Sequence, residues 1–165
     1  MPPIPNQTKS RAILAAEYFI WKNKTTPQAT GLGKLKLQKL LYYAQAWNLV
    51  INKNRLFSED LEAWIHGPAV AMVYHHFKEF NFENPTIELS EQSFADFTEK
   101  EKKLLDEIWR LYGKYDGPYL EALTHNELPW LEARGNMEKN QPSQNIISTD
   151  TMRDFYAKVA ITSGS

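Results

Sequence analysis

The sequence of 165 residues contains no cysteine. Without a thiol, the chain cannot form a disulfide or a thiolate metal site, and it has no cysteine nucleophile. This composition is consistent with the reducing cytoplasm, which is where we expect the protein to act. The first residues lack the apolar core of a secretory signal peptide, and no apolar run approaches the roughly 20 residues of a membrane-spanning helix. We therefore expect no membrane partner.

Motifs for catalysis, metal binding and phosphate binding are also missing. The sequence contains no H-x-x-x-H or H-E-x-x-H pair for zinc and no G-x-S-x-G nucleophile elbow. Gly31 and Gly33 precede Lys34, but a phosphate-binding loop requires Ser or Thr after that lysine, and a leucine follows here. We therefore expect no bound metal, no cofactor and no enzymatic activity.

The remaining composition is that of an ordinary globular protein, with 42% hydrophobic and 24% charged residues. Its length suits one compact domain, which we assign to residues 1–165. The charge is unevenly distributed, because residues 1–58 hold nine Lys or Arg and one acid, whereas residues 59–107 hold twelve acids and four Lys. Either the two regions face each other, or both are solvated, or one of them meets a charged partner.

Lys34, Lys36 and Lys39 form a small basic cluster in the first of these regions. If this cluster forms a face that meets an acidic partner, the attraction speeds their association, and the acidic stretch 59–107 is the alternative contact. The pI of about 6.4 is far from the strongly basic values of nucleic-acid-binding domains, and no helix-turn-helix pair is evident. DNA is therefore not an expected partner.

Apolar residues recur at helical spacing in most of the chain, which predicts a mainly α fold. The clearest helix covers residues 35–51, and its predicted buried stripe comprises Leu37, Leu40, Leu41, Ala44, Trp47 and Ile51. Thr98 and Glu101 form a capping box before another helix. Further helices are expected at residues 8–22, with Thr8 as the cap, and at residues 116–125, 125–135 and 148–161.

Residues 61–66 alternate between apolar and polar side chains, which predicts a short strand. Gly67 then supplies a permissive backbone, and Pro68 is expected to begin the next helix in its first turn. The fold class that these patterns predict is a single compact, mainly α domain with a small β element near residues 61–66.

The histidines have two interpretations. His66 and His125 are either imidazoles that fasten irregular backbone by hydrogen bonds or, alternatively, the general base of a hydrolase with Glu62 as the orienting carboxylate. His75 and His76 are adjacent on a predicted helix, where their directions differ by about 100°, so they do not form one metal site.

Three motifs occur in order: K-L-L-Y-Y-A-Q at residues 39–45, E-A-W-I-H-G-P at 62–68 and T-H-N-E-L-P-W-L-E-A-R at 124–134. In combination they resemble the Panacea domain family, also described as SocA-like or GepA-like and phage-associated. The resemblance covers about residues 8–158. It implies a mostly helical domain that acts as an antitoxin in a toxin–antitoxin system.

Members of this family typically neutralise the product of a neighbouring toxin gene by direct contact, so the resemblance implies a cognate toxin protein as the partner. The motif residues that either define the fold or bind this partner are Gln38, Tyr42, Tyr43, Gln45, Trp64, His66, Gly67, Pro68, His125, Pro129 and Trp130. The junctions around Trp64 and Trp130 are expected to pack on each other, and Tyr42, Tyr43 or the loop tryptophans are the candidate exposed anchors for the toxin.

Two other functions stay open. The protein is alternatively a proteolytic adaptor that delivers a toxin to a protease, which adds the protease as a second partner. The remaining alternative is the His-dependent hydrolase. A toxin-like neighbouring reading frame would favour either binding function over the hydrolase.

Overall fold

The computed structural model describes residues 9–163, and it is mainly helical, as predicted. None of the helices in this part of the chain is long and apolar enough to cross a bilayer. Strands β1 (Glu62–Trp64) and β2 (Gly67–Ala69) pair antiparallel as a small hairpin. The helices are α1 (Arg11–Thr25), α2 (Lys34–Ile51), α3 (Ala71–His76), the 3-10 helix η1 (Glu91–Phe94), α4 (Glu99–Tyr112), α5 (Gly117–His125), α6 (Leu128–Arg134) and α7 (Thr149–Ser163).

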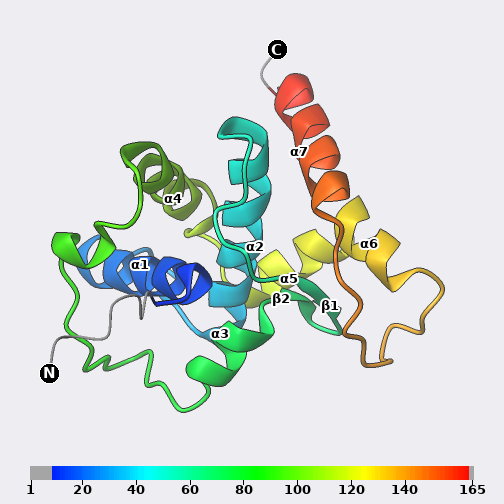
Figure 1. Ribbon diagram of the computed structural model, residues 1–165. Coiled ribbons are helices and arrows are strands. Elements are labelled where there is room, and N and C mark those ends of the chain that lie inside the picture. The colour runs from blue at the N-terminus through cyan, green and yellow to red at the C-terminus, as the bar shows by residue number, and fades with distance from the viewer. Residues whose placement is uncertain (1–8, 164–165) are drawn as a thin grey trace, which may run out of the picture.

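Helix α2 stands at the centre of the fold (Figure 1). Helices α1 and α4 pack on one side of it and α7 on the other, while α3, α5 and β2 contact its remaining surface. Nearly all buried hydrophobic residues of these elements belong to one cluster. The centre of the fold is therefore a helix with neighbours on nearly every side.

Because other elements surround α2, more of its surface is buried than the predicted stripe. Both flanks of the helix are buried as well, whereas Ile51, which was assigned to the stripe, is 62% exposed at the end of the helix. The expectation that Tyr42 and Tyr43 are exposed anchors is wrong, because both are 0% exposed. A single buried stripe applies to a helix that faces water on one side, and α2 does not.

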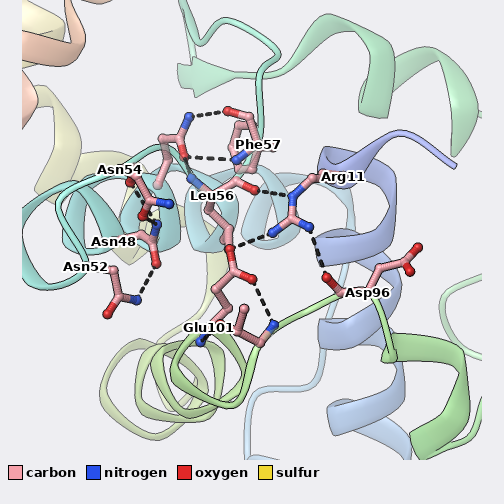
Figure 2. Close-up of polar contacts among 10 residues, drawn as sticks. Arg11, Asn48, Asn52, Asn54, Leu56, Phe57, Asp96 and Glu101 are labelled. Atoms are coloured by element: carbon pink, nitrogen blue, oxygen red, sulfur yellow. Dashed lines mark hydrogen bonds and ion pairs between the residues drawn. The ribbon is translucent and has the colours of Figure 1, made fainter. Parts of the chain in front are cut away.

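Polar side chains on α2 hold neighbouring loops by hydrogen bonds to their backbone. The Gln45 amide nitrogen donates to the carbonyl of Phe57 at 2.8 Å, and its amide oxygen accepts from the N–H of Leu56 at 2.7 Å. One turn further along, Asn48 donates to the carbonyl of Asn54 at 2.8 Å (Figure 2). These bonds satisfy loop backbone that packing would otherwise leave buried without a partner.

Arg11 connects three segments of the same region (Figure 2). Its guanidinium donates to the carbonyl of Leu56 at 2.8 Å and to that of Asp96 at 3.2 Å, and it pairs with Glu101 at 2.6 Å. Glu101 also accepts from the N–H of Thr98, which confirms the predicted capping box of α4. Helix α1, the 56–57 loop and α4 are thereby held together.

Of two predicted helix starts, one is wrong and the other lies outside the described residues. Pro68 does not begin a helix but lies in β2, and α3 begins at Ala71 after Val70. The register of the hairpin pairs Pro68 with Ala63, so the chain turns back on β1 before it becomes helical. Thr8 lies outside the described residues, and Ser10 caps α1 by accepting from the N–H of Ile13.

We predict that Gln45→Met lowers the free energy of unfolding by about 2–4 kcal/mol. The substitution keeps an apolar chain of similar length but leaves the N–H of Leu56 and the carbonyl of Phe57 without partners. Urea unfolding of the two purified proteins measures the difference.

Gln141→Met is the matched control, because Gln141 is exposed. This control should change the free energy of unfolding by less than about 0.5 kcal/mol. Equal effects of the two substitutions would show that the hydrogen bonds of Gln45 do not stabilise the fold.

Candidate functional site: the hairpin groove

Helix α6 fixes the β1–β2 hairpin from one side. The indole N–H of Trp130 donates to the carbonyl of Trp64 at 2.9 Å, and Arg134 donates to the carbonyl of Ala63 at 3.1 Å. Arg134 is only 4% exposed and also donates to the carbonyls of Glu138 and Gln141. The two sequence motifs that contain Trp64 and Trp130 therefore lie against each other.

The segment before α7 covers the outer edge of β1. The N–H of Ala63 donates to the carbonyl of Asn145 at 2.8 Å, and the N–H of Ile147 donates to the carbonyl of Leu61 at 2.8 Å. Residues 145–147 thus extend the hairpin by a short bridge between Glu62 and Ile146. This edge of β1 is already paired.

Side chains of α2 occupy the outer edge of β2 in the same way. The ammonium of Lys39 donates to the carbonyl of Pro68 at 2.8 Å. The amide of Gln38 accepts from the N–H of Val70 at 2.8 Å and donates to its carbonyl at 3.2 Å. Gln38 therefore makes to Val70 the two backbone hydrogen bonds that a neighbouring strand would otherwise make.

Gly67 is the first residue of β2, directly after the turn at residues 65–66, and its φ is +101°. A Cβ atom here would lie 2.7 Å from Cε of Lys39 and 2.9 Å from Oγ1 of Thr124. Both the backbone angle and the lack of space therefore require glycine at this position. The glycine lets the hairpin rest directly on α2 and α5.

The predicted basic face of Lys34, Lys36 and Lys39 is wrong for two of its three members. Lys36 is 3% exposed and Lys39 is 1% exposed, whereas Lys34 is exposed. Burial lowers the pKa of Lys39 to about 7, although the carboxylate of Glu121 opposes the shift. The two lysines are interior groups because α2 is surrounded by other elements.

His66 and His125 occupy different environments. The ring of His66 is exposed and lies 3.1 Å from Oε1 of Glu121. His125 stacks on Trp130 with 4.0 Å between ring centroids, and burial lowers its pKa. Glu62, the predicted orienting carboxylate, instead accepts from the indole N–H of Trp64 at 2.9 Å. The proposed pairing of Glu62 with a histidine base is therefore not formed.

Metal ligands do not gather in the described part of the chain. Among residues 9–163, no three His, Asp or Glu side chains are placed so that they could hold one ion. His75 and His76 are both exposed at the end of α3.

A groove of about 740 Å³ lies beside the hairpin. It contains Gln38, Trp64, His66 and Gly67 of the predicted site, whereas His125 and Trp130 support the hairpin from behind. The residues that line it are Lys34, Leu35, Gln38, Lys39, Trp64, Ile65, His66, Gly67, Ala69, Tyr74, Pro142, Ser143 and Gln144. Sequence patterns did not indicate the wall at 142–144, because this segment is a loop without periodicity.

Three other predicted site residues lie in the core, away from this groove. The hydroxyl of Tyr43 donates to Glu127 at 2.6 Å, and the hydroxyl of Tyr156 donates to that of Tyr42 at 2.9 Å. Gln45 holds the 56–57 loop, as described above. The predicted set therefore divides into residues of the groove, residues behind the hairpin and residues of the core around α2.

Comparison with known families identifies the domain. Residues 37–131 match the family model described as "Antitoxin SocA-like, Panacea domain". The chain belongs to this family. No curated protein and no solved structure matches the chain. The Panacea match begins in α2 and ends in α6, so it includes the hairpin and Lys39, while the groove wall at 142–144 lies beyond it.

We predict that Gly67→Ala lowers the free energy of unfolding by at least about 2 kcal/mol, because it combines backbone strain with a steric overlap. Gly31→Ala has open space around its Cβ but also a positive φ, so it measures the backbone cost alone, about 1 kcal/mol. Gly33→Ala has neither problem, but Gly33 is the N-cap of α2, where alanine is disfavoured, so its loss should stay at or below about 1 kcal/mol. Equal losses at all three positions in urea unfolding would contradict the role of Gly67.

Lys39 should make the free energy of unfolding depend on pH. Its pKa falls from an ordinary value of 10.5 to about 7 on folding. The unfolded chain therefore binds more protons between these values, and stability rises as the pH rises through this range. We expect urea unfolding to show a rise from pH 7 to 9 that is smaller in Lys39→Met. An equal rise in both proteins would assign it to other groups, such as Lys36.

Proposed function

We propose that this protein is an antitoxin that neutralises its cognate toxin by direct contact, and that the toxin binds at the hairpin groove. The groove supports this proposal, because Lys39, Trp64, His66 and Gly67 of the sequence motifs line it and because it combines a large volume with aromatic walls. Trp64 and Tyr74 contact each other edge to face on the groove wall, with 5.3 Å between their ring centroids. Large aromatic side chains are the residues that most often contribute binding energy at protein interfaces.

The surface around the groove is suited to a protein partner. Tyr74 is 39% exposed and Met72, on the same short helix, is 50% exposed. A stable interface buries about 1,600 Å², which is more than the groove itself offers, so the toxin has to contact its rim as well. We expect α3 to form part of that rim.

Preorganisation of the groove favours tight binding. The hairpin is held by Trp130 and Arg134 on one side and by Gln38 and Lys39 on the other. The walls therefore lose little conformational freedom when a partner binds, and more of the contact energy appears as affinity. Neutralisation then consists of covering the toxin's active site or its route to substrate.

Co-expression with the neighbouring gene product tests this function. We expect that product to stop growth when expressed alone, and growth to return, with a complex that purifies as one species, when this protein is present. Toxicity that this protein does not relieve would refute the antitoxin function. Rescue that requires a protease, together with loss of the toxin, would support the adaptor alternative instead.

Two tyrosines provide a matched test of the binding surface. Tyr74 lines the groove and is 39% exposed, whereas Tyr119 on α5 is 50% exposed and lies outside it. Tyr74→Ala should weaken the complex at least about tenfold, the effect of losing an interface anchor, and Tyr119→Ala should change it less than about twofold. The reverse ranking in a calorimetric titration would place the interface on another face.

A further inference from the structure

Apart from Tyr74, the ionisable residues that line the groove are all basic. They are Lys34, Lys39 and His66, and no Asp or Glu lines it, although the chain contains 20 acids against 19 Lys and Arg. Two carboxylates lie against wall residues without lining the groove themselves: Glu121 is 3.1 Å from Nδ1 of His66, and Glu62 accepts from the indole N–H of Trp64 at 2.9 Å. A partner that enters this groove therefore meets the amino groups of Lys34 and Lys39 between apolar walls, and no carboxylate on the wall itself.

Lys39 is a buried lysine whose hydrogen-bonding capacity is not filled. An ammonium carries three donors, and within residues 9–163 Lys39 donates to one acceptor, the carbonyl of Pro68. No ion pair of the described chain includes it. Lys36 is buried as well, but it donates to three acceptors, in Thr30, Gly31 and Gly113. Lys39 therefore has two donors left for a ligand, and Lys36 has none.

A partner does not bind here by adding a strand to the hairpin. Gln38 and Lys39 already hold the outer edge of β2, and residues 145–147 already pair with β1. Strand addition requires a free edge with unpaired N–H and C=O groups. Recognition in the groove must therefore depend on side chains.

We propose that the groove receives an acidic side chain of the toxin and that the ammonium of Lys39 is its counter-ion. This inference rests on the proposed function, because it names the chemistry by which the same partner is recognised. Lys39 is 1% exposed, so a carboxylate reaches it only at the end of a side chain whose backbone stays at the rim. The residues that flank this acid are apolar and pack against Trp64, Ile65 and Tyr74.

Such a contact distinguishes an acid from its amide strongly. Lys39 is already buried in the free protein, so binding adds little to the burial of its side chain, and a carboxylate in contact favours the ammonium over the neutral amine. The carboxylate supplies the acceptors and the negative charge that the site lacks, whereas a glutamine side chain supplies acceptors without the charge. Specificity for one acidic position in the toxin follows.

A double-mutant cycle with the purified toxin tests this pairing. Each exposed Asp or Glu of the toxin is changed in turn to its amide, and the dissociation constant is measured with the wild-type chain and with Lys39→Met. We expect one toxin substitution to weaken binding to the wild-type chain at least about tenfold and binding to Lys39→Met less than about threefold. A complex in which no toxin acid is coupled to Lys39 overturns the inference and leaves the antitoxin function intact, whereas absence of any complex refutes both.

Two lysine variants serve as controls for the cycle. Lys34→Gln removes a positive charge from the exposed rim of the same groove, so it should affect the association rate and leave the discrimination between acid and amide unchanged. Lys36→Met removes a buried lysine outside the groove wall, so it should lower stability without changing that discrimination. Loss of discrimination in either control would contradict the assignment to Lys39.

A measurement on the wild-type chain avoids the effect of substitution on folding. NMR of lysine labelled with ¹³C at Cε gives the pKa of Lys39 in the free protein and in the complex. A carboxylate in contact raises this pKa by at least about one unit, whereas an apolar partner that only adds burial lowers it. A pKa that falls or does not change on complex formation overturns the inference.

Discussion

The fold depends on hydrogen bonds that buried polar side chains of α2 make to the backbone of neighbouring segments. Gln38 holds Val70, Lys39 holds Pro68 and Gln45 holds Leu56 with Phe57. Each of these contacts fixes a segment that has no regular secondary structure of its own or only a three-residue strand. Removing one partner leaves buried backbone without a hydrogen bond, which costs more than the net gain from an average bond.

Close contact of the hairpin with α2 also shapes the groove. Because Gly67 has no side chain, the hairpin rests directly on Lys39 and Thr124. Trp130 and Arg134 then hold the hairpin from the opposite side. The motif residues therefore serve both the fold and the groove, because Trp130 and Arg134 behind the hairpin position Trp64, His66 and Gly67, which line the groove.

Sequence patterns predicted the helices, a strand near residues 61–66 and the capping box of α4, because these depend on local periodicity and capping chemistry. They did not predict the burial of Lys39 or Tyr43, because polar and aromatic residues on the flank of an amphipathic helix are ordinarily solvated. That burial is set by how many elements surround α2, which no local pattern records. Pro68 was misassigned for a similar reason, since its pairing partner Ala63 lies across a turn. The resemblance to Panacea domains supplied the motif residues but not their division between groove and core.

The central claim is that the toxin covers the hairpin groove. Hydroxyl-radical footprinting with mass spectrometry measures this most directly, since it compares side-chain oxidation in the free protein and in the toxin complex. The account predicts that Trp64, Met72 and Tyr74 are protected by complex formation, while exposed Tyr119 and Ile161 on other surfaces are oxidised as before. Unchanged oxidation of Trp64 and Tyr74, with protection at Tyr119 or Ile161, would contradict it.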